Sequence, residues 1–242
     1  MIGLAQQSSK ASDLPLVGGC LGAFALLVIF VLVWTFVIAP RRARRQLDEY
    51  RKRGYAEADA KAPELSAALA ALTPIMLEGT LHFGEGQRVP LNAMVNRSGS
   101  HPRYVVNLAE RTDNQDDSGT VWRTIFLESR PLPGAAEFSA RLAAVNIGQG
   151  REERLGLHPV QPAGASSEFA AAYSVFSASG SVNLPVSLQE ALLNAARALG
   201  VASRFNTRFT PAGWAISVSN AYLQPKTLRA LVDAAERIST AL

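Results

Sequence analysis

The sequence predicts an α+β fold, with one N-terminal transmembrane helix, then an antiparallel β-meander, followed by a β-α-β-β-α unit. Three observations predict it. Residues 15–40 read PLVGGCLGAFALLVIFVLVWTFVIAP and contain no charged side chain. Residues 75–146 fall into short β-branched and aromatic segments that turn-forming residues separate. Residues 168–242 alternate strand patterns with two amphipathic helical patterns.

The apolar segment 15–40 is typical of a membrane span, because a helix needs about 20 apolar residues to cross a hydrocarbon core of about 30 Å. A buried core helix would normally carry a polar face. A cleaved signal peptide would have an apolar region of only about 7–15 residues behind a basic start, whereas Lys10 is the one base before this segment. We therefore expect a retained helix, with residues 1–14 as a short extracytoplasmic N-terminus. Gly18 and Gly22 form a G-x-x-x-G spacing and are candidates for helix association.

A basic cluster follows the apolar segment directly. Its members are Arg41, Arg42, Arg44, Arg45, Arg51, Lys52 and Arg53. Seven positive charges against Asp48 and Glu49 give residues 41–53 a charge of +5. Because the whole chain carries +4 and residues 1–40 cancel, residues 54–242 sum to −1. Excess Lys and Arg beside a span mark its cytoplasmic side. The cluster thus predicts a single-pass protein of the bacterial inner membrane with a cytoplasmic C-terminal domain.

The same cluster predicts the partners. Basic residues at a membrane surface attract anionic lipid headgroups, so the lipid bilayer is one expected partner. Nucleic acid is not expected, since a nucleic-acid-binding domain spreads its basic residues over a folded face. The reversed topology, with the domain in the periplasm, is the alternative. The bacterial source is an inference from composition, as arginine far outnumbers lysine and alanine is abundant.

The rest of the chain divides by composition. Residues 41–74 read as a basic juxtamembrane helix and stalk, with a helix that begins near Pro63. Residues 75–146 form the meander, and residues 147–167 form a Gly-, Pro- and Ser-containing linker. The predicted strands of the meander are MLEGTLHF, RVPLNAMV, PRYVVNLAER, TVWRTIFLES and EFSARLAAV.

Residues 168–242 have the clearest pattern. AAYSVFSA reads as a strand, and Ser187 with Glu190 three residues later reads as the capping box of a helix that Gly200 ends. Two strands then flank the turn TPAG, and Pro225 opens a second amphipathic helix. The expected order is strand, helix, strand, strand, helix, with both helices packed on the sheet.

The sequence contains no recognisable catalytic motif. It has neither a G-x-x-x-x-G-K-[ST] phosphate loop nor a G-x-S-x-G nucleophile elbow. His82, His101 and His158 are far apart, and no second histidine or cysteine stands three or four residues from any of them, as a metal site often requires. The lone Cys20 excludes a disulfide framework within the chain. We therefore predict no catalytic, cofactor-binding or metal-binding residues and no cofactor.

The C-terminal third carries a resemblance. The segments SSEFAAAYSVFS, LPVSLQEALLNAARALG, RFTPAGWAISV and LQPKTLRALVDAAERI resemble those of uncharacterised bacterial single-pass membrane proteins with a C-terminal cytosolic α+β domain. The resemblance covers mainly residues 167–240 and implies no activity or catalytic residue.

Two functions follow from these observations. The first is a membrane-anchored protein whose cytosolic α+β domain serves as an interaction or regulatory module, with a membrane protein or a second copy of the chain as partner. The alternative is a membrane-proximal enzyme that acts on an envelope or lipid-derived substrate. The enzyme requires a pocket with convergent Asp, Glu, His or Arg side chains, whereas the module does not.

Overall fold

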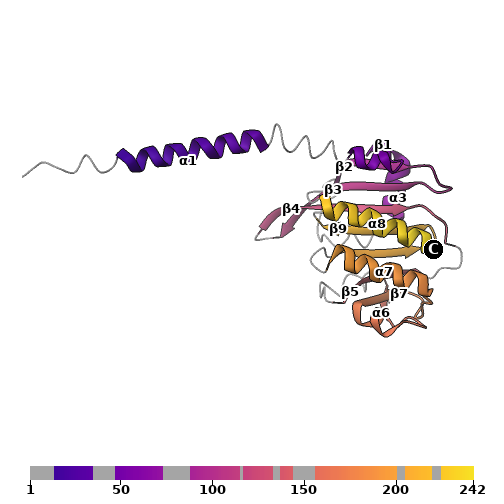
Figure 1. Ribbon diagram of the computed structural model, residues 1–242. Coiled ribbons are helices and arrows are strands. Elements are labelled where there is room, and N and C mark those ends of the chain that lie inside the picture. The colour runs from indigo at the N-terminus through magenta and orange to yellow at the C-terminus, as the bar shows by residue number, and fades with distance from the viewer. Residues whose placement is uncertain are drawn as a thin grey trace, which may run out of the picture. The chain divides into compact units, whose positions relative to one another are not determined.

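The fold is that of a computed structural model, which describes residues 14–34, 47–72, 88–114, 117–132, 137–143, 156–200, 205–219 and 225–242. The chain divides into two compact units, Met1–Lys52 and Arg53–Leu242. The second unit is an α+β domain built on one large antiparallel sheet (Figure 1). The α+β class predicted from the sequence is confirmed.

The predicted transmembrane helix over 15–40 is wrong. Helix α1 covers Leu14–Val33, but among the described residues no helix is long and apolar enough to cross a membrane. The membrane location and the topology, which we inferred from the same segment, stay predictions.

Nine strands form the sheet, in the order β1-β2-β3-β4-β9-β8-β5-β7-β6. In chain order they are β1 (Ala56–Ala58), β2 (Arg88–Asn96), β3 (Arg103–Asn114), β4 (Asp117–Glu128), β5 (Phe138–Leu142), β6 (His158–Val160), β7 (Tyr173–Ser177), β8 (Asn206–Thr210) and β9 (Gly213–Ser219). Every neighbouring pair is antiparallel. Because β4 pairs with β9, and β5 lies between β8 and β7, the segments 75–146 and 168–242 share one sheet.

One face of the sheet packs on helix α3 (Pro63–Leu72). Side chains alternate between the two faces of a strand, and Ile125, Leu127 and Ala215 point to the α3 side. There they pack with Leu65 and Leu69 in one buried apolar cluster. The register places Leu127 opposite Ala215, which brings β4 and β9 to the same part of this core.

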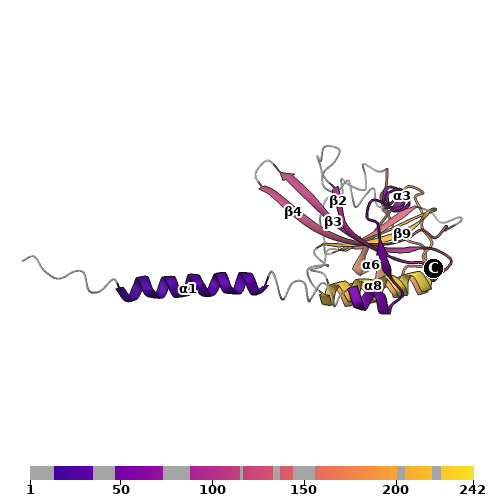
Figure 2. The ribbon, with the colours of Figure 1, turned by 90° about the horizontal axis from the view of Figure 1, so that it is seen from above.

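The opposite face of the sheet is covered by α7 (Val186–Leu199) and α8 (Pro225–Ala241). Figure 1 shows these helices side by side, and Figure 2 shows α8 and α3 on opposite sides of the sheet. Aromatic rings fill this second core. Trp214 lies 5.4 Å from Phe126 and 6.0 Å from Phe209, between ring centroids, and Phe138 stacks on Phe209 at 4.5 Å. A ring adds large apolar area and a preferred packing geometry.

The helices are tied to the sheet by buried polar groups. The Tyr173 hydroxyl on β7 donates to the Leu192 carbonyl oxygen of α7 at 2.6 Å. Gln189 of α7 is buried; its amide nitrogen donates to the Leu184 and Gly164 carbonyl oxygens, and its amide oxygen accepts from the Ser166 N–H. Buried polar groups of this kind stabilise a fold only when their hydrogen bonds are made, and these are.

The observed elements follow the expected order over residues 173–241, and before this range the structure has three elements that were not predicted. These are strands β1 and β6 and the short helix α6 (Ser167–Ala172), which lie in segments read as spacer, linker or strand. Helix α7 begins at Val186, one residue before the predicted cap, and its N-cap is Pro185 without a side-chain cap bond. The capping box at Ser187 is therefore wrong, and the Ser187 hydroxyl instead donates to the Ala241 carbonyl oxygen at 3.3 Å. The predicted strand MLEGTLHF lies outside the described residues.

Candidate functional site

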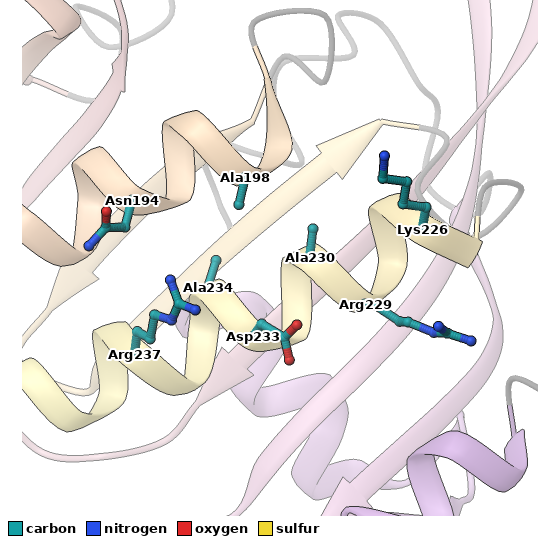
Figure 3. A pocket seen from close by; sticks show the side chains of 8 residues that line it. All are labelled: Asn194, Ala198, Lys226, Arg229, Ala230, Asp233, Ala234 and Arg237. Atoms are coloured by element: carbon teal, nitrogen blue, oxygen red, sulfur yellow. The ribbon is translucent and has the colours of Figure 1, made fainter.

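A groove of about 480 Å³ lies between α7 and α8. Figure 3 shows its lining, to which α7 contributes two side chains and α8 contributes six. The lining residues are Asn194, Ala198, Lys226, Arg229, Ala230, Asp233, Ala234 and Arg237. We call this feature the α7–α8 groove. Its volume falls within the roughly 300–1,000 Å³ that ligand-binding clefts occupy.

Helical periodicity explains why these side chains meet. Residues three and four apart lie on the same face of a helix, so Lys226, Ala230, Asp233 and Arg237 follow one side of α8. Leu231 and Ile238 are buried on the side that faces the sheet. The polar side of this helix is therefore the side that the domain presents outward.

Three cations and one carboxylate line the groove, and the carboxylate is already engaged. The Asp233 carboxylate accepts a hydrogen bond from the Arg53 guanidinium at 2.5 Å, and the same guanidinium lies 3.8 Å from the Glu236 carboxylate. Within the described residues no carboxylate pairs with Lys226 or Arg237. Both side chains are exposed. The groove therefore presents positive charge around a floor of small alanine side chains.

A second, smaller cavity of about 230 Å³ lies where β3 begins and β4 ends. We call it the arginine pocket, and Gly99, Ser100, His101, Arg103, Glu128 and Arg130 line it. The strand register places Arg103 directly opposite Glu128. Glu128 is only 2% exposed. Its two oxygens accept from Arg103 Nε at 3.3 Å and from Trp214 Nε1 at 3.0 Å.

A further charged group is buried on the α3 side of β5 and β8. Arg208 is 6% exposed and its guanidinium donates to the Glu137 carboxylate. Arg141 on the neighbouring strand places its guanidinium carbon 4.7 Å from the Phe176 ring centroid, a cation–π arrangement. A buried charge needs such partners to offset its lost hydration. We assign these residues to the stability of the sheet rather than to a site.

Two tyrosines have perturbed ionisation. Burial raises the pKa of Tyr55 well above its ordinary value of about 10, and the nearby Glu236 carboxylate raises it further. Burial alone raises the pKa of Tyr173. A desolvated phenolate is unfavourable, so both groups remain neutral hydroxyls throughout the physiological range.

The structure brings together only part of the set that the sequence singled out. Arg41, Arg42, Arg44 and Arg45 lie outside the described residues. Arg51 lies 3.5 Å from Asp48 in the first unit, and Lys52 is exposed. Arg53 belongs to the second unit and bonds Asp233. Gly18 and Gly22 lie on α1, where side chains are not described.

The three histidines of the chain are the side chains most suited to bind a metal ion. His101 lines the arginine pocket, and His158 lies on β6. His82 lies outside the described residues. Among the residues that the structure describes, no group of three or more His, Cys, Asp or Glu side chains converges to hold a metal ion.

Sequence reasoning missed both cavities. The signal for the α7–α8 groove was present, because Lys226, Arg229, Asp233 and Arg237 recur three or four residues apart, opposite the apolar positions of the same helix. The arginine pocket gave no such signal, since its residues come from a loop and two strands.

Comparison with models of protein families, with curated proteins and with solved structures finds no match to this chain.

Proposed function

We propose that residues 53–242 form a protein-interaction module whose α7–α8 groove binds an acidic helix of a partner protein. The observation that carries the proposal is the lining of the groove, in which the exposed Lys226 and Arg237 side chains lie beside a floor of alanines and the Asp233 carboxylate is engaged by Arg53. Alanine leaves room for another backbone to approach closely. Helices commonly bind by laying one face into such a groove.

Charge complementarity favours an acidic occupant. Lys226 and Arg237 lie on one side of α8, about three helical turns apart, so glutamates on one face of a partner helix can face both. Contacts of this kind raise the association rate and the specificity more than the affinity. We therefore expect a dissociation constant of about 10–100 μM, typical of transient complexes, for a single acidic helix.

The test uses the full chain and a fluorescein-labelled helical peptide of about 18 residues that carries alanines on one face and glutamates beside them. Fluorescence anisotropy is expected to give saturable binding, which weakens as the Debye length falls from about 10 Å at 0.1 M salt to about 3 Å at 1 M. The double variant Lys226→Glu/Arg237→Glu is expected to bind about tenfold or more weakly, since that loss corresponds to about 1.4 kcal/mol over two contacts.

The matched control is Lys61→Glu/Arg97→Glu, which changes the net charge by the same amount. Both control residues are exposed away from the groove, and Arg97 lies 3.6 Å from Glu64 of α3. The proposal predicts unchanged affinity in this control. Equal weakening in both double variants would mean that the peptide responds to net charge alone and would overturn the proposal. So would self-association of the chain through the groove, seen by analytical ultracentrifugation and lost in Lys226→Glu/Arg237→Glu, because the occupant would then be a second copy.

A further inference from the structure

The arginine pocket contains a carboxylate that is fixed in place. Both Glu128 oxygens accept hydrogen bonds, one from Arg103 and one from Trp214, and the side chain is buried. A general base must be within reach of a substrate proton, and here both oxygens are committed to protein donors. Glu128 thus orients Arg103 and holds its guanidinium at the wall of the pocket.

The two arginines of the pocket also share one helix end. Arg103 donates from Nη2 to the Ser239 hydroxyl at 3.0 Å, and Arg130 donates from Nη1 to the Ser239 carbonyl oxygen at 3.0 Å. A guanidinium has five N–H groups, so these bonds and the bond to Glu128 use fewer than half of the ten available. Ser100 and His101 line the same cavity as the two arginines.

The charge and the size of the pocket define its ligand. Two guanidiniums against one carboxylate leave a net positive lining, so an anion is favoured. At about 230 Å³, the cavity is smaller than the roughly 300–1,000 Å³ of sites for drug-sized molecules. Arginine forks match the oxygens of phosphate and carboxylate groups, and a small oxyanion fits the volume available.

We propose that the arginine pocket is a binding site for a single phosphate group, either the free ion or the terminal group of a small phosphate ester. Arg130 and Arg103 bind its oxygens, and Ser100 and His101 complete the site. The site is separate from the α7–α8 groove, and the inference does not depend on the proposed function. Because both arginines bond Ser239, the bound anion also adds to the interactions that hold the end of α8.

Isothermal titration of the full chain with sodium phosphate, at constant ionic strength, tests the proposal. One site per chain with a dissociation constant of about 1 mM or below is expected. Arg130→Gln is the primary variant, since it leaves the Glu128–Arg103 and Glu128–Trp214 bonds intact. It is expected to weaken binding about tenfold, the factor that corresponds to one charged contact of about 1.4 kcal/mol. The control is Arg97→Gln, which removes an exposed arginine from the loop between β2 and β3 that also carries Ser100 and His101. It is expected to bind phosphate like the parent.

A second readout is thermal. A ligand that binds only the folded state raises the melting temperature in proportion to ln(1 + [L]/Kd), so at the same phosphate concentration the parent and Arg97→Gln should be stabilised more than Arg130→Gln. Glycerol phosphate distinguishes the sources, because tighter binding than inorganic phosphate identifies an ester as the ligand. An equal shift with sodium chloride at matched ionic strength, or phosphate binding that Arg130→Gln leaves unchanged, would overturn the proposal.

Discussion

At the residue scale, the turn between β8 and β9 depends on Gly213. Its φ is +146°, and a Cβ built there would lie 2.2 Å from the Glu128 carbonyl oxygen. That contact is with backbone, so a rotamer change cannot relieve it. The strand register pairs Gly213 with Thr210, directly across the TPAG turn predicted from the sequence.

We therefore predict that Gly213→Ala lowers the free energy of unfolding by about 3 kcal/mol or more, through strain at a special φ and a backbone clash. The control is Gly164→Ala, at φ +71° with no atom within 4 Å of the added Cβ. It should cost only about 1 kcal/mol, the penalty for the left-handed conformation. Urea unfolding of the full chain measures both values. If Gly213→Ala and Gly164→Ala lowered the free energy of unfolding equally, the close approach to the Glu128 carbonyl oxygen would have no energetic effect.

Tyr55 and Tyr173 predict how stability changes at alkaline pH. Their pKa values are raised in the folded state, so above a pH of about 10 the unfolded chain loses these protons while the folded chain retains them. The free energy of unfolding then falls as the pH rises, by up to about 1.4 kcal/mol per pH unit for each tyrosine.

The variant Tyr55→Phe/Tyr173→Phe should flatten this decline. Denaturant midpoints of the parent and the variant, measured between about pH 9 and pH 11, on either side of the ordinary tyrosine pKa of about 10, give the comparison. Loss of the Tyr173 bond to the Leu192 carbonyl oxygen lowers stability at every pH, so the slope is the diagnostic quantity. Parallel curves for the two proteins would contradict the assignment.

At the element scale, the alanines of α7 and α8 determine whether the groove is open. Ala198 is exposed on α7 and lines the groove, so a large side chain there blocks the groove without entering the core. Ala198→Trp is expected to weaken binding of the acidic peptide about tenfold, which corresponds to about 1.4 kcal/mol, because the indole occupies the space of the partner backbone.

Ala67→Trp provides the control for this substitution, since Ala67 is exposed on α3. Anisotropy titrations should show the same affinity for Ala67→Trp as for the parent, and thermal melting should show that both variants keep the parent's stability. If Ala198→Trp bound the peptide as tightly as the parent, the groove would not be the binding surface.

The long amphipathic elements were predictable from the sequence and the short ones were not. Helix α8 repeats its apolar positions over 17 residues, so the period is clear. Strands β1 and β6 are three residues long, too short to show a period of two. Helix α7 was located correctly, but its N-cap is Pro185 and not the predicted Ser187, two residues later.

At the scale of the whole molecule, pairing between distant segments determined what the sequence could reveal. The α+β class followed from local patterns. That β4 pairs with β9 and that β5 inserts between β8 and β7 depends on contacts between residues far apart in the chain, which local periodicity does not encode. The arginine pocket is unpredictable for the same reason, since Arg103 and Glu128 meet only through the register of β3 and β4.

The apolar N-terminal segment shows the limit of a compositional criterion. Its lack of charge predicted a span over 15–40, yet within the described residues no helix meets the length and apolarity of a membrane crossing. The charge of +5 on residues 41–53 does not depend on that prediction. Its position in the sequence places Arg53 in the basic cluster, but in the folded domain its guanidinium pairs with Asp233 and Glu236.

If the α7–α8 groove recognises an acidic helix through its charge, exchanging the charges of groove and peptide should reverse the preference for the peptide. Anisotropy is measured for the parent and for Lys226→Glu/Arg237→Glu, each with the glutamate peptide and with the same peptide carrying lysine at every glutamate. We expect the parent to prefer the glutamate peptide and the Lys226→Glu/Arg237→Glu variant to prefer the lysine peptide, while Lys61→Glu/Arg97→Glu behaves like the parent. Charge recognition by the groove is refuted if the variant binds neither peptide more tightly than the parent binds it, or if the control also reverses its preference.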